Sequence, residues 1–182
     1  MLGGAAQLEA VRHPCDRSWT LENHISEIDH RYLRRAIQLA LDAEKKGNLP
    51  IGCVVSFDGR NVAEGKNAMW APEFNPIRHA EIEALTRVPR ELWASSRLVT
   101  VYSTLEPCLM CTAAILQHGV GRVMYGSSDD YGGVGSAIGH MPPYFEEEFA
   151  TVEWLGPVLP EECDPLYRRA IEAIETRRRS FE

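Results

Sequence analysis

The strongest constraint on the fold of this chain is the spacing of three residues that can bind one metal ion. His79 is followed, further along the chain, by the run Pro107-Cys108-Leu109-Met110-Cys111. One neutral imidazole and two thiolates fill three of the four tetrahedral positions of Zn²⁺ and leave the fourth open, which separates a catalytic zinc from a structural one. The fold must therefore bring His79 beside Cys108 and Cys111.

Glu81 adds a carboxylate that is not a metal ligand. It lies two residues after His79, and the pattern H-x-E followed by P-C-x-x-C is typical of zinc-dependent nucleobase deaminases. In that chemistry Glu81 moves protons, first from water to a ring nitrogen and then to the departing amine. The structural alternative, an acidic residue that only complements a helix N-terminus, fits Glu83 better.

Two other interpretations of the cysteine pair are open. C-x-x-C alone also occurs in redox pairs and in structural zinc sites. A structural site needs a fourth Cys or His nearby, but Cys15, Cys53 and Cys163 are scattered, and a redox pair leaves His79 and Glu81 unexplained. We therefore favour a catalytic zinc. Cys53 is expected in the core of an apolar strand, and the other two thiols at the surface or partly buried.

Composition places limits on the organisation of the chain. Its 182 residues, 45% of them hydrophobic, predict one domain over residues 28–182, preceded by an extension over residues 1–27 without clear periodicity. No apolar run is long enough to span a membrane. Five cysteines without a framework spacing are typical of a reducing compartment, so we expect a cytoplasmic protein.

The hydrophobic pattern predicts an α/β fold. Helices are expected over residues 28–46, 79–85, 108–117 and 161–179. Strands are expected over residues 51–57, 61–65, 97–103, 122–126 and 150–155. Asp58-Gly59 is a hairpin turn, whereas the strands joined through the helix at 108–117 should be parallel. The result is a mixed five-stranded sheet with helices on both faces.

The segment between residues 66 and 78 is irregular and contains Met69, Trp70 and Phe74. These side chains could form the wall of a pocket that stacks a nucleobase. They could also simply pack beneath the loop, and we favour packing because a single loop aromatic does not make a stacking platform.

Several motifs together resemble the cytidine/deoxycytidylate deaminase-like superfamily, within it the branch of tRNA adenosine deaminases and small-molecule nucleobase and nucleoside deaminases. The similarity runs from about Ile28 to the C-terminal helix. The motifs are Asn48-Leu49-Pro50-Ile51-Gly52, Gly65-Lys66-Asn67, His79-Ala80-Glu81-Ile82, Thr104-Leu105-Glu106-Pro107-Cys108-Leu109-Met110-Cys111 and Gly121-Arg122-Val123-Met124-Tyr125-Gly126.

The resemblance implies a three-layer α/β/α fold, one catalytic zinc ion per chain and a homodimer. The positions that match the family's zinc ligands are His79, Cys108 and Cys111. Glu81 matches the proton shuttle, and Asn67 matches the asparagine that holds the substrate. The backbone N–H of Ala80 matches the family's contact to the edge of the base.

The substrate is less constrained than the chemistry. The tRNA-acting branch carries basic residues in the loop that here spans residues 127–136, whereas this chain has Asp129 and Asp130 and no Lys or Arg there. The net charge of −7 argues against nonspecific binding of polyanions, although a local basic patch remains compatible with it. Five arginines of the C-terminal helix are interleaved with glutamates and favour a solvated helix face.

We therefore expect deamination of a free nucleobase, a nucleoside or a related small heterocycle, with ammonia as the second product. The alternative is a tRNA-specific adenosine deaminase that converts adenosine to inosine in an anticodon loop. The sequence does not separate purine from pyrimidine substrates.

Overall fold

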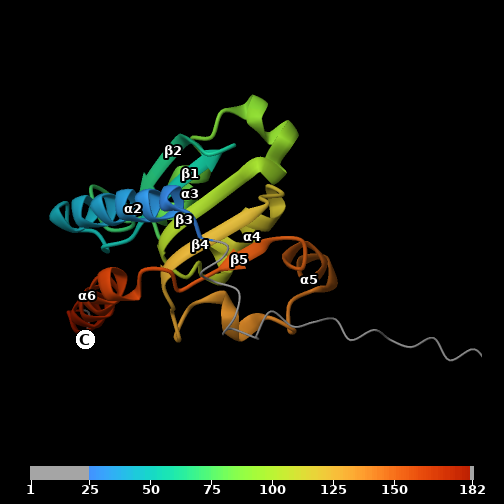
Figure 1. Ribbon diagram of the computed structural model, residues 1–182. Helices are drawn as coiled ribbons and strands as arrows, with labels where there is room; N and C mark the ends of the chain where they lie inside the picture. Colours follow the sequence, from blue (N-terminus) through green and yellow to red (C-terminus); the bar gives the residue numbers. More distant parts are fainter. Residues whose placement is uncertain (1–24, 181–182) are drawn as a thin grey trace, which may run out of the picture.

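Five strands form one mixed sheet in the computed structural model, which describes residues 25–180 (Figure 1). The strands are β1 (Gly52–Phe57), β2 (Arg60–Lys66), β3 (Val99–Leu105), β4 (Arg122–Ser127) and β5 (Glu153–Leu155). Their order is β2-β1-β3-β4-β5. Strand β1 is antiparallel to both β2 and β3, whereas β3, β4 and β5 are parallel. The predicted mixed five-stranded sheet is confirmed.

Helices cover both faces of this sheet. The α-helices are α2 (Glu27–Lys45), α3 (Ala80–Leu85), α4 (Leu109–Gln117), α5 (Pro143–Phe149) and α6 (Pro160–Arg179). The 3₁₀ segments η1 (Arg90–Leu98) and η2 (Val134–Ala137) lie between them in the chain. Helices α2 and α6 touch each other on one face, α3 and α4 touch on the other, and α5 packs against α4. The three-layer α/β/α architecture is therefore confirmed.

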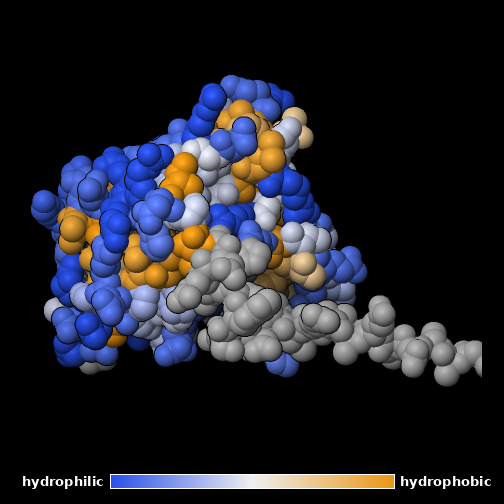
Figure 2. Space-filling view, in the orientation of Figure 1, coloured by the Kyte–Doolittle hydropathy of each residue, from blue (hydrophilic) through white to orange (hydrophobic). Residues whose placement is uncertain are grey.

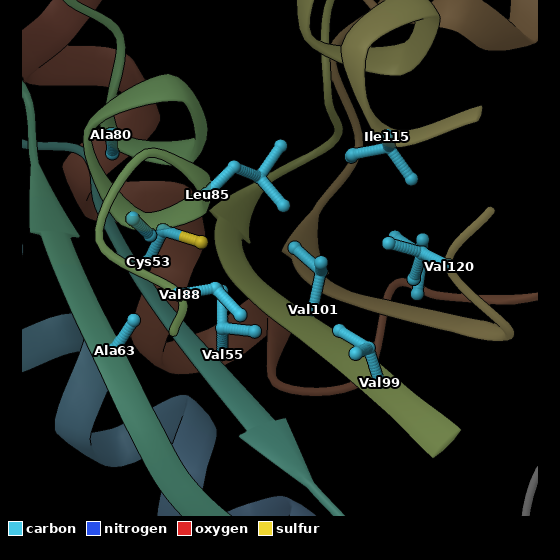
Figure 3. Packing of buried hydrophobic residues seen from close by; sticks show 12 residues of the cluster. Cys53, Val55, Ala63, Ala80, Leu85, Val88, Val99, Val101, Ile115 and Val120 are labelled. Carbon is cyan, nitrogen blue, oxygen red and sulfur yellow. The ribbon is translucent and has the colours of Figure 1, made fainter. Parts of the chain in front are cut away.

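Alternation along the strands builds a separate core on each face. Cys53 and Val55 of β1 lie in the core beneath α3 and α4, whereas Val54 between them lies in the core beneath α2. Figure 3 shows the first of these cores, with Val99 and Val101 of β3 in the same cluster. Because successive side chains of a strand point to opposite faces, one apolar strand serves both cores, and Cys53 is a core residue as predicted.

Helix α2 begins at a capping box. Ser26 accepts a hydrogen bond from the Asp29 backbone, and the Asp29 side chain accepts one from the Ser26 backbone. This cap starts the helix one residue before the predicted boundary at Ile28. The exposed side carries arginines such as Arg31 and Arg34, and Figure 2 shows hydrophilic residues prevailing over this part of the surface.

Two glycines allow helices to lie directly on the sheet. A Cβ atom at Gly52 would overlap the carbonyl oxygen of Ala36 in α2, and one at Gly65 would overlap the carbonyl oxygen of Ala80 in α3. Only a residue without a side chain tolerates such backbone approach. Gly65 therefore places the first turn of α3, and with it His79, against the end of β2.

The predicted hairpin is present, with positive φ at both Asp58 and Gly59, as a type I′ turn requires. Three other expectations need correction. Strand β3 starts two residues later than predicted, because Arg97 and Leu98 complete η1, and it continues to Leu105 instead of turning at Thr104. Helix α5 was not expected within the region following β4.

Cys163 is the third correction, since it is buried rather than at the surface. Its side chain packs against Gly126, where a Cβ atom would collide with the sulfur. Cys15 and most of the predicted extension over residues 1–27 lie outside the described residues. Among residues 25–180, none of the helices combines the length and apolarity needed to cross a membrane.

A buried carboxylate ties α2 to two strands of the sheet. Asp29 is 1% exposed and accepts hydrogen bonds from Tyr102 of β3 and Arg122 of β4, each at 2.8 Å. Burial alone would raise the pKa of Asp29, but hydrogen bonds from Ser26 and Tyr102 and the charge of Arg122 outweigh it and hold the pKa below the ordinary carboxyl value.

We predict that Asp29→Asn lowers the free energy of unfolding by about 2–3 kcal/mol at pH 7, because Arg122 loses its buried carboxylate partner, whereas the Glu153 carboxylate with which it also pairs is more exposed. A carboxyl whose pKa is depressed by folding stabilises the protein fully above its ordinary pKa of 3.8 and loses this contribution as the pH falls through the lower folded value. Urea unfolding should therefore show a difference in the free energy of unfolding between variant and wild type that becomes smaller below pH 3.8. Asp58→Asn, the same change at an exposed turn, should leave stability unchanged; equal losses in the two variants would contradict the account.

Candidate active site

Two helix N-termini meet at one edge of the sheet. His79 is the N-cap residue of α3 and Cys108 is the N-cap residue of α4, and neither side chain is used to cap its helix. Cys108 comes soon after β3 ends at Leu105. The side chains at the two helix starts are therefore available for another partner, in a position where helix dipoles favour negative charge.

Three ligand atoms converge at this edge. The side-chain donors of His79, Cys108 and Cys111 all lie within 4.8 Å of one another, and each sulfur lies 3.6 Å from Nδ1 of His79. Zinc bonds of ordinary length at tetrahedral angles separate a sulfur and a nitrogen ligand by about 3.6 Å. The donors thus have the chemistry and the spacing to hold a zinc ion.

The electrostatics of the two cysteines favour a thiolate at this site. Hydrogen bonding from Cys111, followed by the effect of His79, lowers the pKa of Cys108 to about 4 despite its partial burial. The bond to Cys108 and burial raise the pKa of Cys111. A cation between the two sulfurs would favour the thiolate form of both.

Glu81 is buried beside the three donors. Its side chain is 3% exposed, Oε1 accepts a hydrogen bond from Ser103 at 2.7 Å, and Oε2 lies 3.4 Å from Sγ of Cys111. Burial raises the pKa of the Glu81 carboxyl, which the Ser103 bond partly offsets. A carboxyl whose pKa is raised by burial takes up a proton more readily than an exposed one, as a proton carrier must.

The side-chain amide of Asn67 has an N–H group without a hydrogen-bond partner among the described residues. It is 1% exposed, its Oδ1 accepts from the backbone N–H of Met69 at 3.2 Å, and its Nδ2 is buried without a partner among residues 25–180. A buried amide N–H without a partner is costly, so a ligand that accepts from Nδ2 would be stabilised. The backbone bond from Ala68 to Arg78, at 3.0 Å, holds Asn67 near His79.

Ala80, the remaining predicted contact, is fully buried. It is the first residue of α3, so its backbone N–H has no acceptor within the helix. The structure thus brings the predicted catalytic and metal-binding residues together and leaves two N–H donors, at Ala80 and Asn67, for a substrate.

Two residues of the site were missed from the sequence. Ser103 orients Glu81, and counting by two from Val99 and Val101 of β3 would have placed it on the face beneath α3. Glu106 accepts hydrogen bonds from the backbones of Asp129 and Gly135, at 3.2 and 2.9 Å. It thereby fastens the loop after β4 onto the metal-binding turn, and no local pattern indicated this.

The two carboxylates of that loop are not equivalent. Asp129 accepts hydrogen bonds from the backbones of Tyr131 and Gly132 and from the hydroxyl of Tyr167 at 2.8 Å. All three bonds are made to Oδ1 of Asp129, which is partly exposed, whereas Asp130 is exposed. The expected packing of Phe74 beneath its loop is wrong, because this side chain is 63% exposed.

The chain is similar to known deaminases along most of its length. It is 39% identical over 142 residues to a tRNA-specific adenosine deaminase of Haemophilus influenzae, covering 76% of this chain and 80% of that protein. It is 36% identical over 138 residues to a tRNA-specific adenosine deaminase of Bacillus subtilis, covering 74% and 83%. A solved structure from work on A-to-I editing by tRNA:A34 deaminases at the wobble position superposes with a TM-score of 0.55 and 32% identity, covering 63% of this chain and 90% of that one.

These relatives contradict the expectation of a free nucleobase, nucleoside or related heterocycle as the substrate. The expectation depended on a net charge of −7 and on two acidic loop residues. Net charge describes the whole molecule and not one surface. Two acidic residues of one loop likewise do not describe the whole surface that an RNA would contact.

We predict that Cys111→Ala lowers the zinc content of the purified protein from one ion per chain to well below half, because two protein ligands bind far more weakly than three. Cys53→Ala and Cys163→Ala change thiols of similar burial outside the site and should keep their zinc. Elemental analysis of protein purified without chelators measures all three. Equal zinc content in Cys111→Ala and in the two controls would contradict this assignment.

The central part of the chain matches a known protein family. Residues 26–127, from the cap of α2 to the end of β4, match the cytidine and deoxycytidylate deaminase zinc-binding region. That range includes every residue proposed for the metal and the proton transfer. The chain therefore belongs to the cytidine and deoxycytidylate deaminase family and is a zinc-dependent deaminase, a hydrolase that acts on C–N bonds.

Proposed function

We propose that this protein converts adenosine to inosine in the anticodon loop of a tRNA. The observation that carries the proposal is the similarity to two tRNA-specific adenosine deaminases, each matched over more than 70% of both chains. The reaction consumes one water molecule, replaces the amine at C6 of adenine with oxygen and releases ammonia. The loops of a folded RNA suit this chemistry, because an unpaired base can leave the stack at low cost.

The proposed roles follow from the geometry of the site. His79, Cys108 and Cys111 would hold the zinc ion, which supplies water whose pKa is lowered to about 7 when bound. Glu81, held by Ser103, would take a proton from the attacking water and deliver it to the ring nitrogen beside C6 while the water oxygen bonds to C6. It would then take the proton of the new C6 hydroxyl and pass it to the amine. The C–N bond breaks, ammonia leaves, C6 keeps its oxygen as a carbonyl and Glu81 is again a carboxylate.

Two N–H donors would orient the base. The unpartnered Nδ2 of Asn67 suits an acceptor atom of the substrate, and the backbone N–H of Ala80 suits the edge of the base. Ala80 lies between the proposed ligand His79 and Glu81, so a base held there meets the metal and the proton carrier together. Since tRNA is a cytoplasmic substrate, we also propose that the protein acts in the cytoplasm.

We predict that the wild-type protein forms inosine in an anticodon stem-loop with adenosine at the first anticodon position, and that Glu81→Gln lowers turnover by a factor of about 100 or more. Mass analysis of nucleosides from the digested RNA measures the product. Glu83→Gln is the matched control, because Glu83 lies on the same helix but pairs with Arg78 and Arg87 at its surface. Turnover that survives in Glu81→Gln would remove its proposed role, and a wild type inactive on the hairpin but active on free cytosine would overturn the proposed substrate.

We further propose that the active protein is a homodimer. Exposed apolar side chains flank the site, with Ile77, in the loop before α3, 57% exposed and Leu109, the first residue of α4, 55% exposed. Burying them against a second copy would remove apolar surface from water. Sedimentation of the wild type should give twice the chain mass of 20.4 kDa, and Leu109→Glu should shift it toward the monomer. A monomeric wild type at micromolar concentration would contradict the dimer.

A further inference from the structure

Two aromatic rings and a guanidinium group join the end of α6 to the loop that separates Asn67 from His79. Cζ of Arg177 lies 5.0 Å from the ring centroid of Trp70 and 5.7 Å from that of Phe74. Both distances are within the range of cation–π attraction. Figure 1 shows the end of α6, marked C, at the lower left of the molecule. Despite the contact with Arg177, Phe74 remains 63% exposed, so much of its ring still faces solvent.

This aromatic–arginine cluster, Trp70, Phe74 and Arg177, is fixed relative to the candidate active site. Trp70 lies three residues after Asn67 in the sequence. Oδ1 of Asn48 accepts hydrogen bonds from the backbones of Trp70 and Ala71, at 2.8 and 3.0 Å. Anchored by Asn48 and by Asn67, the loop holds the cluster beside the amide proposed to bind the substrate.

A hollow of about 490 Å³ adjoins the cluster on the side of α6. Its walls include Trp70 and Arg177 together with Glu44, Arg169, Glu172 and Thr176. Glu44 is paired with Arg169 at 2.7 Å, so its charge is compensated. The volume falls within the usual range for small-ligand sites. The lining combines the Trp70 ring with the Arg177 cation and the Glu172 carboxylate, and Phe74 lies outside it.

These features match an unpaired nucleotide. Single-stranded nucleic acids bind by stacking their bases on aromatic rings and guanidinium planes, and cationic side chains meet the phosphates. A base lying on Phe74 would cover its exposed ring and remove apolar surface from water. Arg177, held against the rings, can stack or approach the phosphate without further ordering of its long side chain.

Resting on the proposed tRNA function, we propose that Trp70, Phe74 and Arg177 bind an unpaired nucleotide next to the target adenosine in the anticodon loop. A base stacks on the exposed face of Phe74, and Arg177 interacts with its phosphate. The cluster supplies a local cationic and aromatic surface in a protein whose net charge is −7.

The test measures RNA binding separately from turnover. In the Glu81→Gln background, which is expected to bind but not convert, an anticodon stem-loop carries the fluorescent base 2-aminopurine beside the target adenosine. We expect stacking to quench its fluorescence and Arg177→Met or Phe74→Leu to raise the dissociation constant by about tenfold while restoring the fluorescence. Arg177→Lys keeps the charge but not the planar group, so it should retain only part of the binding.

Matched controls isolate the cluster from general charge and aromatic effects. Arg168→Met removes the same charge from an exposed position of the same helix, and Tyr144→Leu removes an exposed ring from α5. Both variants should keep the quenching and bind the RNA within about twofold of the parent protein. The loss of one distant positive charge accounts for any decrease of that size.

The outcomes distinguish this inference from the proposed function. If the wild type forms inosine in the hairpin but Arg177→Met and Phe74→Leu bind and quench like their controls, the nucleotide-binding role of the cluster is wrong and the proposed function stands. If the wild type neither binds nor converts the hairpin, both the proposed function and the nucleotide-binding role of the cluster are wrong. Quenching lost in the two cluster variants and kept in the two controls supports the inference.

Discussion

The active site depends on the direct packing of α3 against β2 at Gly65, where a single additional carbon atom would collide with the helix backbone. This approach sets the position of His79 at the start of α3, while the end of β3 leads directly to Cys108 at the start of α4. Because β3 lies inside the sheet, paired with β1 and β4, its carboxyl end is held from both sides. The metal-binding triad is thus a consequence of how two helices begin.

The same packing buries the carboxyl of Glu81 beside the metal-binding triad. A carboxylate buried to 3% exposure is costly unless it is paired or protonated. The structure gives it one hydrogen bond, from Ser103, and the neighbouring thiol of Cys111. In the proposed reaction, such incomplete compensation would allow the carboxyl to change its protonation state. By contrast Glu83, two residues further on, is compensated by two arginines at the surface.

The sequence predicted correctly those features of the structure that depend on residues close together in the chain. The turn at Asp58-Gly59 and the two-residue alternation of β1 are short-range patterns, and they predicted the sheet correctly. The ligand types and their spacing predicted three donors, His79, Cys108 and Cys111, that the fold brings together. What failed depended on tertiary contacts. The burial of Cys163 against Gly126 and the bond from Tyr167 to Asp129 join α6 to β4 and the loop after it, and these contacts exist only in the folded chain. The substrate class was wrong because net charge and the composition of one loop do not describe the surface that binds an RNA.

The central claim is that this deaminase acts on the first anticodon adenosine of a tRNA. Sequencing of tRNA from cells in which its gene is disabled tests this directly, because inosine is read as guanosine whereas adenosine is read as adenosine. The account predicts that the guanosine signal at that position disappears, returns with the wild-type gene and does not return with Glu81→Gln. An unchanged guanosine signal in the disabled cells would contradict it.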